Sequence, residues 1–440
     1  MTSSKKLLVL ALTLMSTPLL FAQHMSDAHI KAKAASNRVV YIDGRPESDS
    51  LRNRDRDSLR MVVEQFYYDQ FRNSQDPDMP YFLFLSKGSE LTLGIGGGVR
   101  MRAFYDWNGA MPSNAFAPYT IPIPADPANS RRFNATPSGT YFNVRLIGHN
   151  DVIGAYGLYI EADFTGYNGR DLKLKKSYAV VRDFTVGYAA STFSDPAAQP
   201  AIVDAAGPNN KFSNTNVLVR YMPCFGRKWY VAASIETPST AIDASSGRVK
   251  AASNWLPDAA AFVQYEWERG QHVRLSGIVR SLSYMTLADS KRHTLPGWGV
   301  QASAVGKPES HITLYATVNY GHGYAGLGGD LLHGQYDLVA DPTDPDALYA
   351  PAAMGWCAGL QYNFRPNIFA TLAASQTHYM PRPGVAPAEY KNGTFACANI
   401  FWSIIPRVTV AAEYDFGVRK NFSGEHKAAS RVNLTAMFTF

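Results

Sequence analysis

Charged side chains recur at alternate positions in several short stretches of this chain, with apolar side chains between them. In residues 140–148, Asn143 and Arg145 fall on one face of an extended segment, and the other face carries Phe142, Val144 and Leu146. A period of two is expected for a strand that separates water from an apolar medium. Cationic groups along a watery passage attract anions, so the chemistry that this pattern offers is electrostatic selection.

The direction in which each charged residue points can be predicted from energy. A Lys or Arg side chain on the lipid face near the middle of a bilayer costs about 2–4 kcal/mol. Charged residues in phase with the polar face are therefore predicted to line an interior. The basic ones are Arg100, Arg102, Arg145, Lys173, Lys175, Arg220, Arg274, Arg280, Arg407 and Arg431, and the acidic ones are Glu161, Asp163, Glu236, Glu266, Glu413 and Asp415. The excess of basic groups predicts a mild positive bias; alternatively, the charges pair with one another and only hold the wall together.

The elements that position these charges are short alternating segments, most of them about nine to eleven residues long, which is enough to cross a bilayer at a tilt. Very short turns alternate along the chain with long loops, as in barrels of the bacterial outer membrane. The predicted fold is therefore all-β, a transmembrane antiparallel β-barrel of about sixteen strands over residues 90–440. The predicted strands are 90–107, 140–149, 153–164, 172–181, 184–192, 213–222, 228–237, 258–267, 271–282, 297–305, 310–320, 354–363, 367–376, 393–403, 407–415 and 428–440.

The N-terminal part of the chain differs from the rest in composition and in the spacing of its apolar residues. Residues 1–22 combine a charged start, an apolar run and a small residue before a plausible cleavage point, which predicts a signal peptide. The run is too short to favour a membrane anchor. Residues 23–89 are predicted to be a periplasmic segment with one short helix, because its apolar residues Leu59, Val62, Val63 and Phe66 fall on one helical face. This helix would lie against the barrel mouth or form a short trimeric coil.

Composition excludes several other classes of protein. The net charge of the 440-residue chain is only +6, and its Lys and Arg residues are scattered, which does not suggest nucleic-acid binding. The chain lacks GxSxG and histidines at metal-ligand spacing, so neither an enzyme nor a cofactor or metal site is predicted. The glycines of residues 94–98 are better explained by close backbone packing. Asp341, Asp344 and Asp346 could hold calcium, but the prolines between them favour a plain acidic loop.

The three cysteines give no metal or redox motif. Cys224, Cys357 and Cys397 cannot all pair, and none of them has CxxC spacing. The sequence leaves open whether Cys357 and Cys397 form a disulfide, and small apolar fillers are the favoured interpretation.

The third outer loop, residues 193–212, is predicted to fold into the barrel and narrow it. Its prolines and small residues favour a stiff, compact segment. Asp195 and Asp204 would face the basic side chains and produce a transverse field. A surface loop held by turns is the alternative.

The residues of this region resemble a known family. The segments Glu161-Ala-Asp163-Phe164, Lys175-Lys-Ser-Tyr178-Ala179, Ser191-Thr-Phe-Ser-Asp195 and Val219-Arg220-Tyr221 occur in the order and spacing of the DcaP-like outer-membrane porins. The resemblance covers about residues 90–240; beyond them, only the strand pattern agrees. It implies a trimeric porin of sixteen strands with a basic constriction for small anions such as dicarboxylates. Carried over by residue, it assigns constriction roles to Arg100, Arg102, Arg145, Lys175, Arg220, Asp195 and Asp204.

Two departures from the family pattern matter. The family has arginine and histidine where Lys175 and Lys176 stand, and lysine lacks the planar fork that binds a carboxylate through two hydrogen bonds. The N-terminal coiled coil of the family is also shortened in this chain.

The sequence thus predicts an outer-membrane porin for passive diffusion of small hydrophilic solutes, with a preference for anions. Its partners would be small anionic solutes, membrane lipid and two further copies of the chain. The alternative hypothesis is a plugged barrel with a structural or adhesive role, blocked by the N-terminal helix or by loop 321–353.

Overall fold

The computed structural model describes residues 38–41, 82–85, 91–150, 152–165, 171–212, 214–226, 228–268 and 270–440. The predicted signal peptide and the predicted helix at residues 59–66 lie outside these residues. Within the described part of the chain, no helix combines the length and the apolar character needed to cross a membrane.

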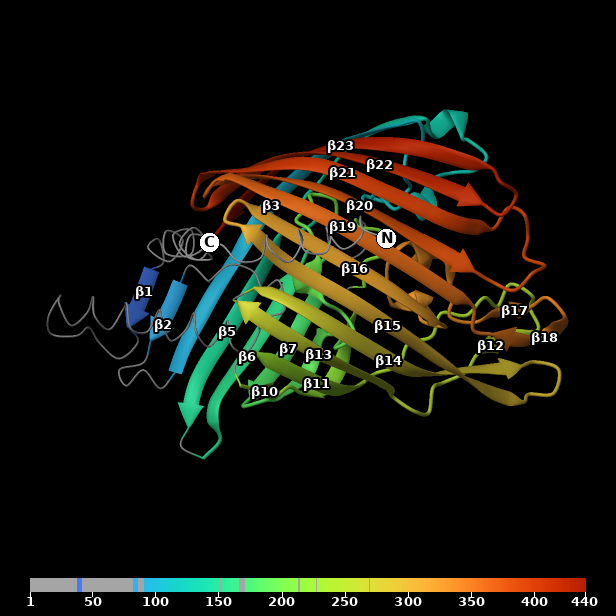
Figure 1. Cartoon of the computed structure of the whole chain (residues 1–440), viewed down its shortest axis with the longest axis horizontal. Coiled ribbons are helices and arrows are strands. Elements are labelled where there is room, and N and C mark those ends of the chain that lie inside the picture. The colour runs from blue at the N-terminus through green and yellow to red at the C-terminus, as the bar shows by residue number, and fades with distance from the viewer. Residues whose placement is uncertain are drawn as a thin grey trace, which may run out of the picture.

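Sixteen antiparallel strands form a closed ring (Figure 1). Each strand pairs with its neighbour along the ring, and β23 returns to pair with β3. In ring order the strands are β3 (Leu91–Trp107), β5 (Tyr141–Asn150), β6 (Gly154–Asp163), β7 (Lys173–Val181), β8 (Phe184–Ala190), β9 (Thr215–Tyr221), β11 (Trp229–Glu236), β13 (Asp258–Glu268), β14 (Gln271–Thr286), β15 (Arg292–Glu309), β16 (Ile312–His322), β19 (Ala352–Arg365), β20 (Ile368–Met380), β21 (Tyr390–Ile405), β22 (Val408–Asn421) and β23 (His426–Thr439). The predicted fold class is thereby confirmed.

The seam of the ring depends on a close approach of backbones. Gly97 and Phe440 exchange two backbone hydrogen bonds of 2.8 Å. A Cβ atom at Gly97 would lie 2.6 Å from the carbonyl oxygen of Tyr141 and 2.8 Å from the Phe440 ring. Glycine at this position therefore serves close packing, as the sequence predicted for residues 94–98.

The alternation of the strands separates an apolar outer face from a polar inner face. On β23, Leu434 is 57% exposed and Phe438 is 48% exposed, whereas Arg431 and Asn433 are fully buried. On β5, Asn143 and Arg145 are likewise buried. The charged residues therefore point inward, as the cost of placing them in lipid requires.

Several short strands and helical turns do not belong to the sixteen-stranded ring. Strand β1 (Arg38–Tyr41) pairs in parallel with β2 (Phe82–Leu85), which pairs antiparallel with β3. The other small elements are β4 (Arg131–Thr136), β10 (Cys224–Phe225), β12 (Val249–Ala251), β17 (Val339–Asp341), β18 (Asp344–Tyr349), η1 (Pro118–Thr120), η2 (Pro127–Asn129), η4 (Pro196–Ala198), η5 (Ala325–Leu327) and η6 (Asp330–Gly334). Strand β4 pairs with the outer end of β3 and was not predicted from the sequence.

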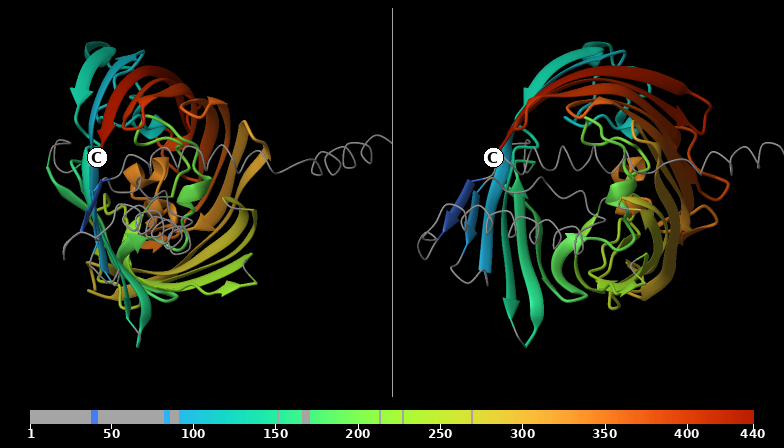
Figure 2. Two further views of the ribbon diagram at one scale, coloured as in Figure 1. Left: turned by 90° about the vertical axis from the view of Figure 1, so that its left-hand side faces the viewer. Right: turned by 60° about the vertical axis from the view of Figure 1, so that its left-hand side comes forward.

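Two long loops fill part of the barrel interior. We call residues 191–214 L3 and residues 323–351 L6. In the rotated views, the green segment that follows β8 runs inside the ring (Figure 2). Phe193 and Phe212 of L3 pack with Tyr324, Leu327 and Leu331 of L6 in one apolar cluster. The lumen thus has a small hydrophobic core of its own, which supports L3 from the outer side.

All three cysteines are free thiols. Cys357 and Cys397 are buried and Cys224 is exposed. The disulfide that the sequence left open does not form.

Candidate channel constriction

L3 begins and ends at a narrow neck between two neighbouring strands. Strand β8 leads into it and β9 leaves it, and the Ser191 N–H donates to the carbonyl of Asn214 over 3.0 Å. Pro196 begins the single turn η4. The loop crosses the lumen as a compact element because its polar groups find partners on the barrel wall.

The first anchor of L3 is the carboxylate of Asp204. Arg102 Nη1 and Arg431 Nη1 lie 2.9 Å and 3.1 Å from Asp204 Oδ2. The other carboxylate oxygen, Oδ1, accepts a hydrogen bond of 2.8 Å from the Phe116 N–H. None of the three charged side chains is more than 3% exposed. Because the site is buried and bonded on both oxygens, Asp204 binds L3 firmly to the seam of the barrel.

Glu413 strengthens the same anchor from the wall. Its carboxylate accepts hydrogen bonds of 2.6 Å from the backbone N–H groups of Val203 and Asp204. Arg100 Nη2 donates to the carbonyl of Val203 over 2.6 Å. Arg100 and Arg102, which the sequence placed in the constriction, are thus both committed to holding L3.

The second anchor is Asp195, on the opposite side of the lumen. His272 Nε2 lies 2.9 Å from Asp195 Oδ2, and Ser303 donates to the same oxygen over 2.5 Å. Arg274 Nη1 lies 3.7 Å from Oδ1. Burial alone would raise the pKa of Asp195, but the charge of Arg274 and the bonds from His272 and Ser303 outweigh it and lower that pKa. Asp195 is therefore a charged tether whose Oδ2 is hydrogen-bonded and whose Oδ1 lies near the charge of Arg274.

The third anchor joins L3 to L6 and to the wall. Asn209 Nδ2 donates to Asp330 Oδ2 over 3.0 Å and to the carbonyl of Gly393 over 2.8 Å. Tyr390 Oη also donates to Asp330 Oδ2, over 2.9 Å. Burial raises the pKa of Asp330 to about 6, despite the two donors that favour its charged form.

This third anchor is expected to weaken as pH rises. A carboxyl has a pKa near 3.9 in an unfolded chain, so Asp330 releases its proton at higher pH in the folded state than in the unfolded state. The contribution of Asp330 to the free energy of unfolding is therefore greatest below about pH 4. It falls by at most about 3 kcal/mol between about pH 4 and pH 6 and stays constant at higher pH. Amide hydrogen exchange of L6 at pH 5 and pH 7.5, corrected for intrinsic rates, should show more opening at the higher pH. Asp330→Asn should remove this dependence; an equal change in the variant would contradict the assignment.

Opposite L3, basic side chains gather on the wall formed by β5, β6, β7 and β9. Arg145 lies over the Tyr159 ring, with its guanidinium carbon 5.0 Å from the ring centroid. Lys176 Nζ lies 5.7 Å from the same centroid and 3.6 Å from Glu161. Lys175 Nζ lies 3.3 Å from Asp163, and its side chain is 40% exposed. We call Arg145, Lys175, Lys176 and Arg220 the basic arc.

A bulge places two consecutive lysines in the lumen. The register between β6 and β7 shifts after Glu161, so that Glu161 pairs with Lys176 and Ala162 pairs with Leu174. Lys175 is the extra residue. Strict alternation would have sent Lys176 to the lipid, and the sequence-based assignment omitted it. The signal was present in the sequence, because two adjacent lysines in a membrane strand can both avoid lipid only through a bulge.

Two further predicted residues, Lys173 and Arg220, lie at or near the ends of their strands, β7 and β9. Lys173 pairs in register with Asp163 at the outer end of β7. Arg220 Nη1 donates to the carbonyl of Ala190 over 3.4 Å, at the neck of L3. Lys211, at the far end of L3, was not predicted as a site residue. Burial and, after it, the positive charge of Lys175 lower the pKa of Lys211.

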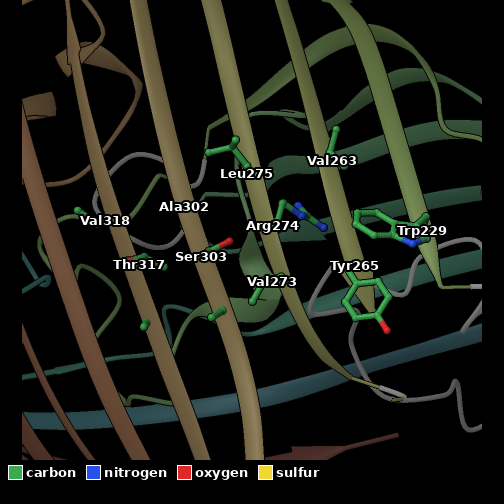
Figure 3. Close-up of a pocket in the computed structure, with 12 residues that line it drawn as sticks. Trp229, Val263, Tyr265, Val273, Arg274, Leu275, Ala302, Ser303, Thr317 and Val318 are labelled. Carbon is green, nitrogen blue, oxygen red and sulfur yellow. The ribbon is translucent and has the colours of Figure 1, made fainter. Parts of the chain in front are cut away.

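The outer wall carries an apolar hollow that is separate from the lumen. It measures about 570 Å³ and spans β11 to β16 (Figure 3). Trp229 and Tyr265 lie at one end of it, and Ala302, Ala304 and Ala316 are among its small lining residues. Its large apolar residues belong to the lipid-facing set of the strands, so the hollow is part of the lipid-facing surface and not of the passage.

Comparisons with known proteins agree with this architecture. The model of the DcaP outer membrane protein family matches residues 88–440. The outer membrane channel DcaP of Acinetobacter baumannii is 20% identical, with a TM-score of 0.69, and the match covers 81% of this chain and 99% of that chain. No curated protein sequence matches the chain.

Two further solved structures are similar at lower identity. The anion-selective porin of Comamonas acidovorans is 12% identical, with a TM-score of 0.52, over 80% of this chain and 100% of that chain. OmpT of Vibrio cholerae in its trimer form is 10% identical, with a TM-score of 0.51, over 80% of this chain and 99% of that chain. At these identities, the structural matches establish the fold.

Proposed function

Because this chain belongs to the DcaP outer membrane protein family and is thus an outer-membrane channel, we propose that it is a porin that prefers small anions, dicarboxylates among them. The observation that carries the proposal is the basic arc on the wall opposite L3. Lys175 pairs with Asp163 and Lys176 with Glu161, and the charge of Glu236 acts on Arg220, so these three carboxylates only partly offset the four cationic groups of the arc. Cationic groups concentrated on one side of a narrow aqueous passage favour anions there.

The carboxylates of L3 support the same preference by their position. Asp195 and Asp204 each contact arginine on the wall, at 3.7 Å and 2.9 Å. In place of the transverse field predicted from the sequence, we assign them an anchoring role. Because arginine side chains lie next to both carboxylates, their negative charges contribute little to the electrostatic potential in the passage. The positive charge of the basic arc therefore dominates that potential.

Lys175 and Lys211 offer a place for a doubly charged solute. One lies on β7 and the other on L3, and the charge of Lys175 acts on Lys211. A dicarboxylate that binds both ammonium groups would share Lys175 with Asp163, which lies 3.3 Å from Lys175 Nζ. Lysine is a point charge, so we expect weak, rapidly exchanging contacts and not tight recognition.

We also propose the remaining features of the family for this chain. Residues 1–22 would act as a signal peptide, residues 23–89 as a periplasmic segment, and residues 90–440 as the barrel with residues 193–212 as its constriction. The functional unit would be a homotrimer, as the family resemblance implies and as the trimer form of the similar Vibrio cholerae protein supports.

Single-channel recording in a planar bilayer tests the proposal. With a potassium chloride gradient across the bilayer, we expect a reversal potential of the sign that chloride preference produces, and conductance steps in groups of three. Folded protein without conductance would contradict the porin proposal. Conductance that is present only after deletion of residues 24–80 would instead identify the alternative, a plugged barrel.

A further inference from the structure

Three side chains with metal-binding atoms meet beneath L3, on the lumen face of β21 and β22. The sulfur of Cys397 and carboxylate oxygens of Glu413 and Asp415 all lie within 4.8 Å of one another. Their residues are 6%, 2% and 0% exposed. Cys397 and Asp415 are directly paired in the strand register, and Glu413 is two positions earlier on the same face as Asp415. The strand pairing itself therefore holds the group together.

Two oxygen atoms at this place have no hydrogen-bond partner among the described residues. Asn433 Nδ2 donates to Asp415 Oδ2 over 2.7 Å, whereas Asp415 Oδ1 and Asn433 Oδ1 are buried and unpartnered. Both side chains are 0% exposed. Buried acceptors without a donor are costly, and a cation is one way of satisfying them. Asn433 is not one of the first three residues, and its hydrogen bond to Asp415 places it next to them.

The charges around this place also leave a deficit of cations. The buried carboxylates and guanidinium groups form a continuous network through the Asp204 anchor. Among the described residues, Asp106 and Asp204 form ion pairs with arginine, whereas Glu413 and Asp415 form none. A buried carboxylate without an ion pair must take up a proton or be balanced by another cation.

We propose that Cys397, Glu413 and Asp415 bind a divalent metal ion of the zinc type, with Asn433 Oδ1 as a further ligand. Thiolate, carboxylate and amide oxygen form a donor set that suits zinc better than calcium or magnesium. Zinc–ligand bonds of about 2.0–2.3 Å place tetrahedral ligands less than about 4 Å apart, so side chains whose ligand atoms now lie within 4.8 Å of one another must rotate inward on binding. On binding, Cys397 gives up its thiol proton to solvent and the sulfur bonds the metal as thiolate.

This site differs from the motifs that the sequence offered. Its ligands come from three strands and are far from the CxxC or CxxH spacing that would have indicated a metal. It also differs from the passage itself, because it lies on the wall behind Val203 and Asp204, to which Glu413 is bonded. A bound metal would stiffen the wall to which L3 is tied. The proposal does not rest on anion preference.

Cadmium serves as the probe, because cadmium bound to thiolate has a charge-transfer band in the ultraviolet. The full chain carrying Cys224→Ser is refolded in detergent with cadmium present, so that access to the buried site does not limit binding, and unbound metal is removed by gel filtration. We expect close to one cadmium per chain, a cadmium–thiolate band, and displacement of the cadmium by zinc. Heat-dependent migration in gels reports whether the barrel is folded.

Matched variants separate a metal site from a packing role. Cys397→Ser should abolish the band, whereas Cys357→Ser, a change at the other buried cysteine, should retain it. Asp415→Asn keeps the shape of the side chain and should weaken binding at least about tenfold, and Asn433→Asp should keep or tighten it. A folded Cys224→Ser protein that holds no cadmium, or a band that survives Cys397→Ser, would overturn the proposal and leave protonated carboxyls as the explanation.

Discussion

Replacing Lys175 and Lys176 together by glutamate is expected to convert the channel from anion to cation preference. Two unit charges about 4 Å apart interact by about 1 kcal/mol in water, so each reversal shifts the energy of a passing anion by about 2 kcal/mol before screening by salt. We expect the permeability ratio of chloride to potassium to fall at least about tenfold. The reversal potential in a potassium chloride gradient measures this ratio directly.

A matched control separates the local charge from the total charge. Lys291 and Lys420 are exposed residues near the outer loops, and changing both to glutamate alters the net charge by the same amount. Salt at 0.1 M screens charges beyond about 10 Å, so this control should leave the reversal potential nearly unchanged. Equal shifts in the two double variants would show that selectivity does not arise at the basic arc.

Alternation predicted the barrel well because lipid imposes it. In the membrane-spanning part of each strand, the cost of a charge on the lipid side forces the pattern, and all sixteen strands were found near their predicted positions. The prediction failed where that constraint ends. Strand β15 begins at Arg292, five residues before the predicted start, because beyond the membrane both faces meet water and need not alternate. Strand β4 was missed for the same reason.

The attachments of L3 were predicted less completely than the wall. Local sequence identified L3, because prolines and small residues are visible within twenty positions. Its attachments are not local: Asp204 meets Arg431, and Val203 meets Glu413, each across more than two hundred residues. The partner of each L3 carboxylate decides whether it faces the passage or the wall. A single sequence does not specify that choice, and the position of the β7 bulge had the same consequence for Lys176.

Under the proposed role of L3 as the constriction, its anchors would fix the width of the passage. L3 is tied at Asp195, at Asp204 and at Asn209, to strands on both sides of the lumen. A loop held at three points would keep a constant distance from the basic arc. Loss of a single anchor should therefore change conductance without unfolding the barrel.

Substitution of Asp204 by alanine is expected to have the largest effect among the anchors. It removes the common partner of Arg102 and Arg431, which are buried, and breaking a buried ion pair costs about 3–5 kcal/mol. The freed middle of L3 should move away from the seam, because the bonds from Glu413 to Val203 and Asp204 cannot hold it alone. We expect noisier open-channel current, an altered single-channel conductance and a lower unfolding temperature.

Two further variants test whether the effect of Asp204→Ala comes from the loss of its ion pairs. Asp204→Asn retains only one acceptor oxygen, which can serve either Arg102 or the Phe116 N–H, so its effects should fall between those of alanine and the unchanged chain. Asp289→Ala removes a carboxylate from an exposed outer turn and should change neither current nor unfolding temperature. If Asp204→Ala left conductance, noise and unfolding temperature as they were, the ion pairs at the seam would not be what positions L3, and the width of the passage would have to be set by the apolar contacts between L3 and L6.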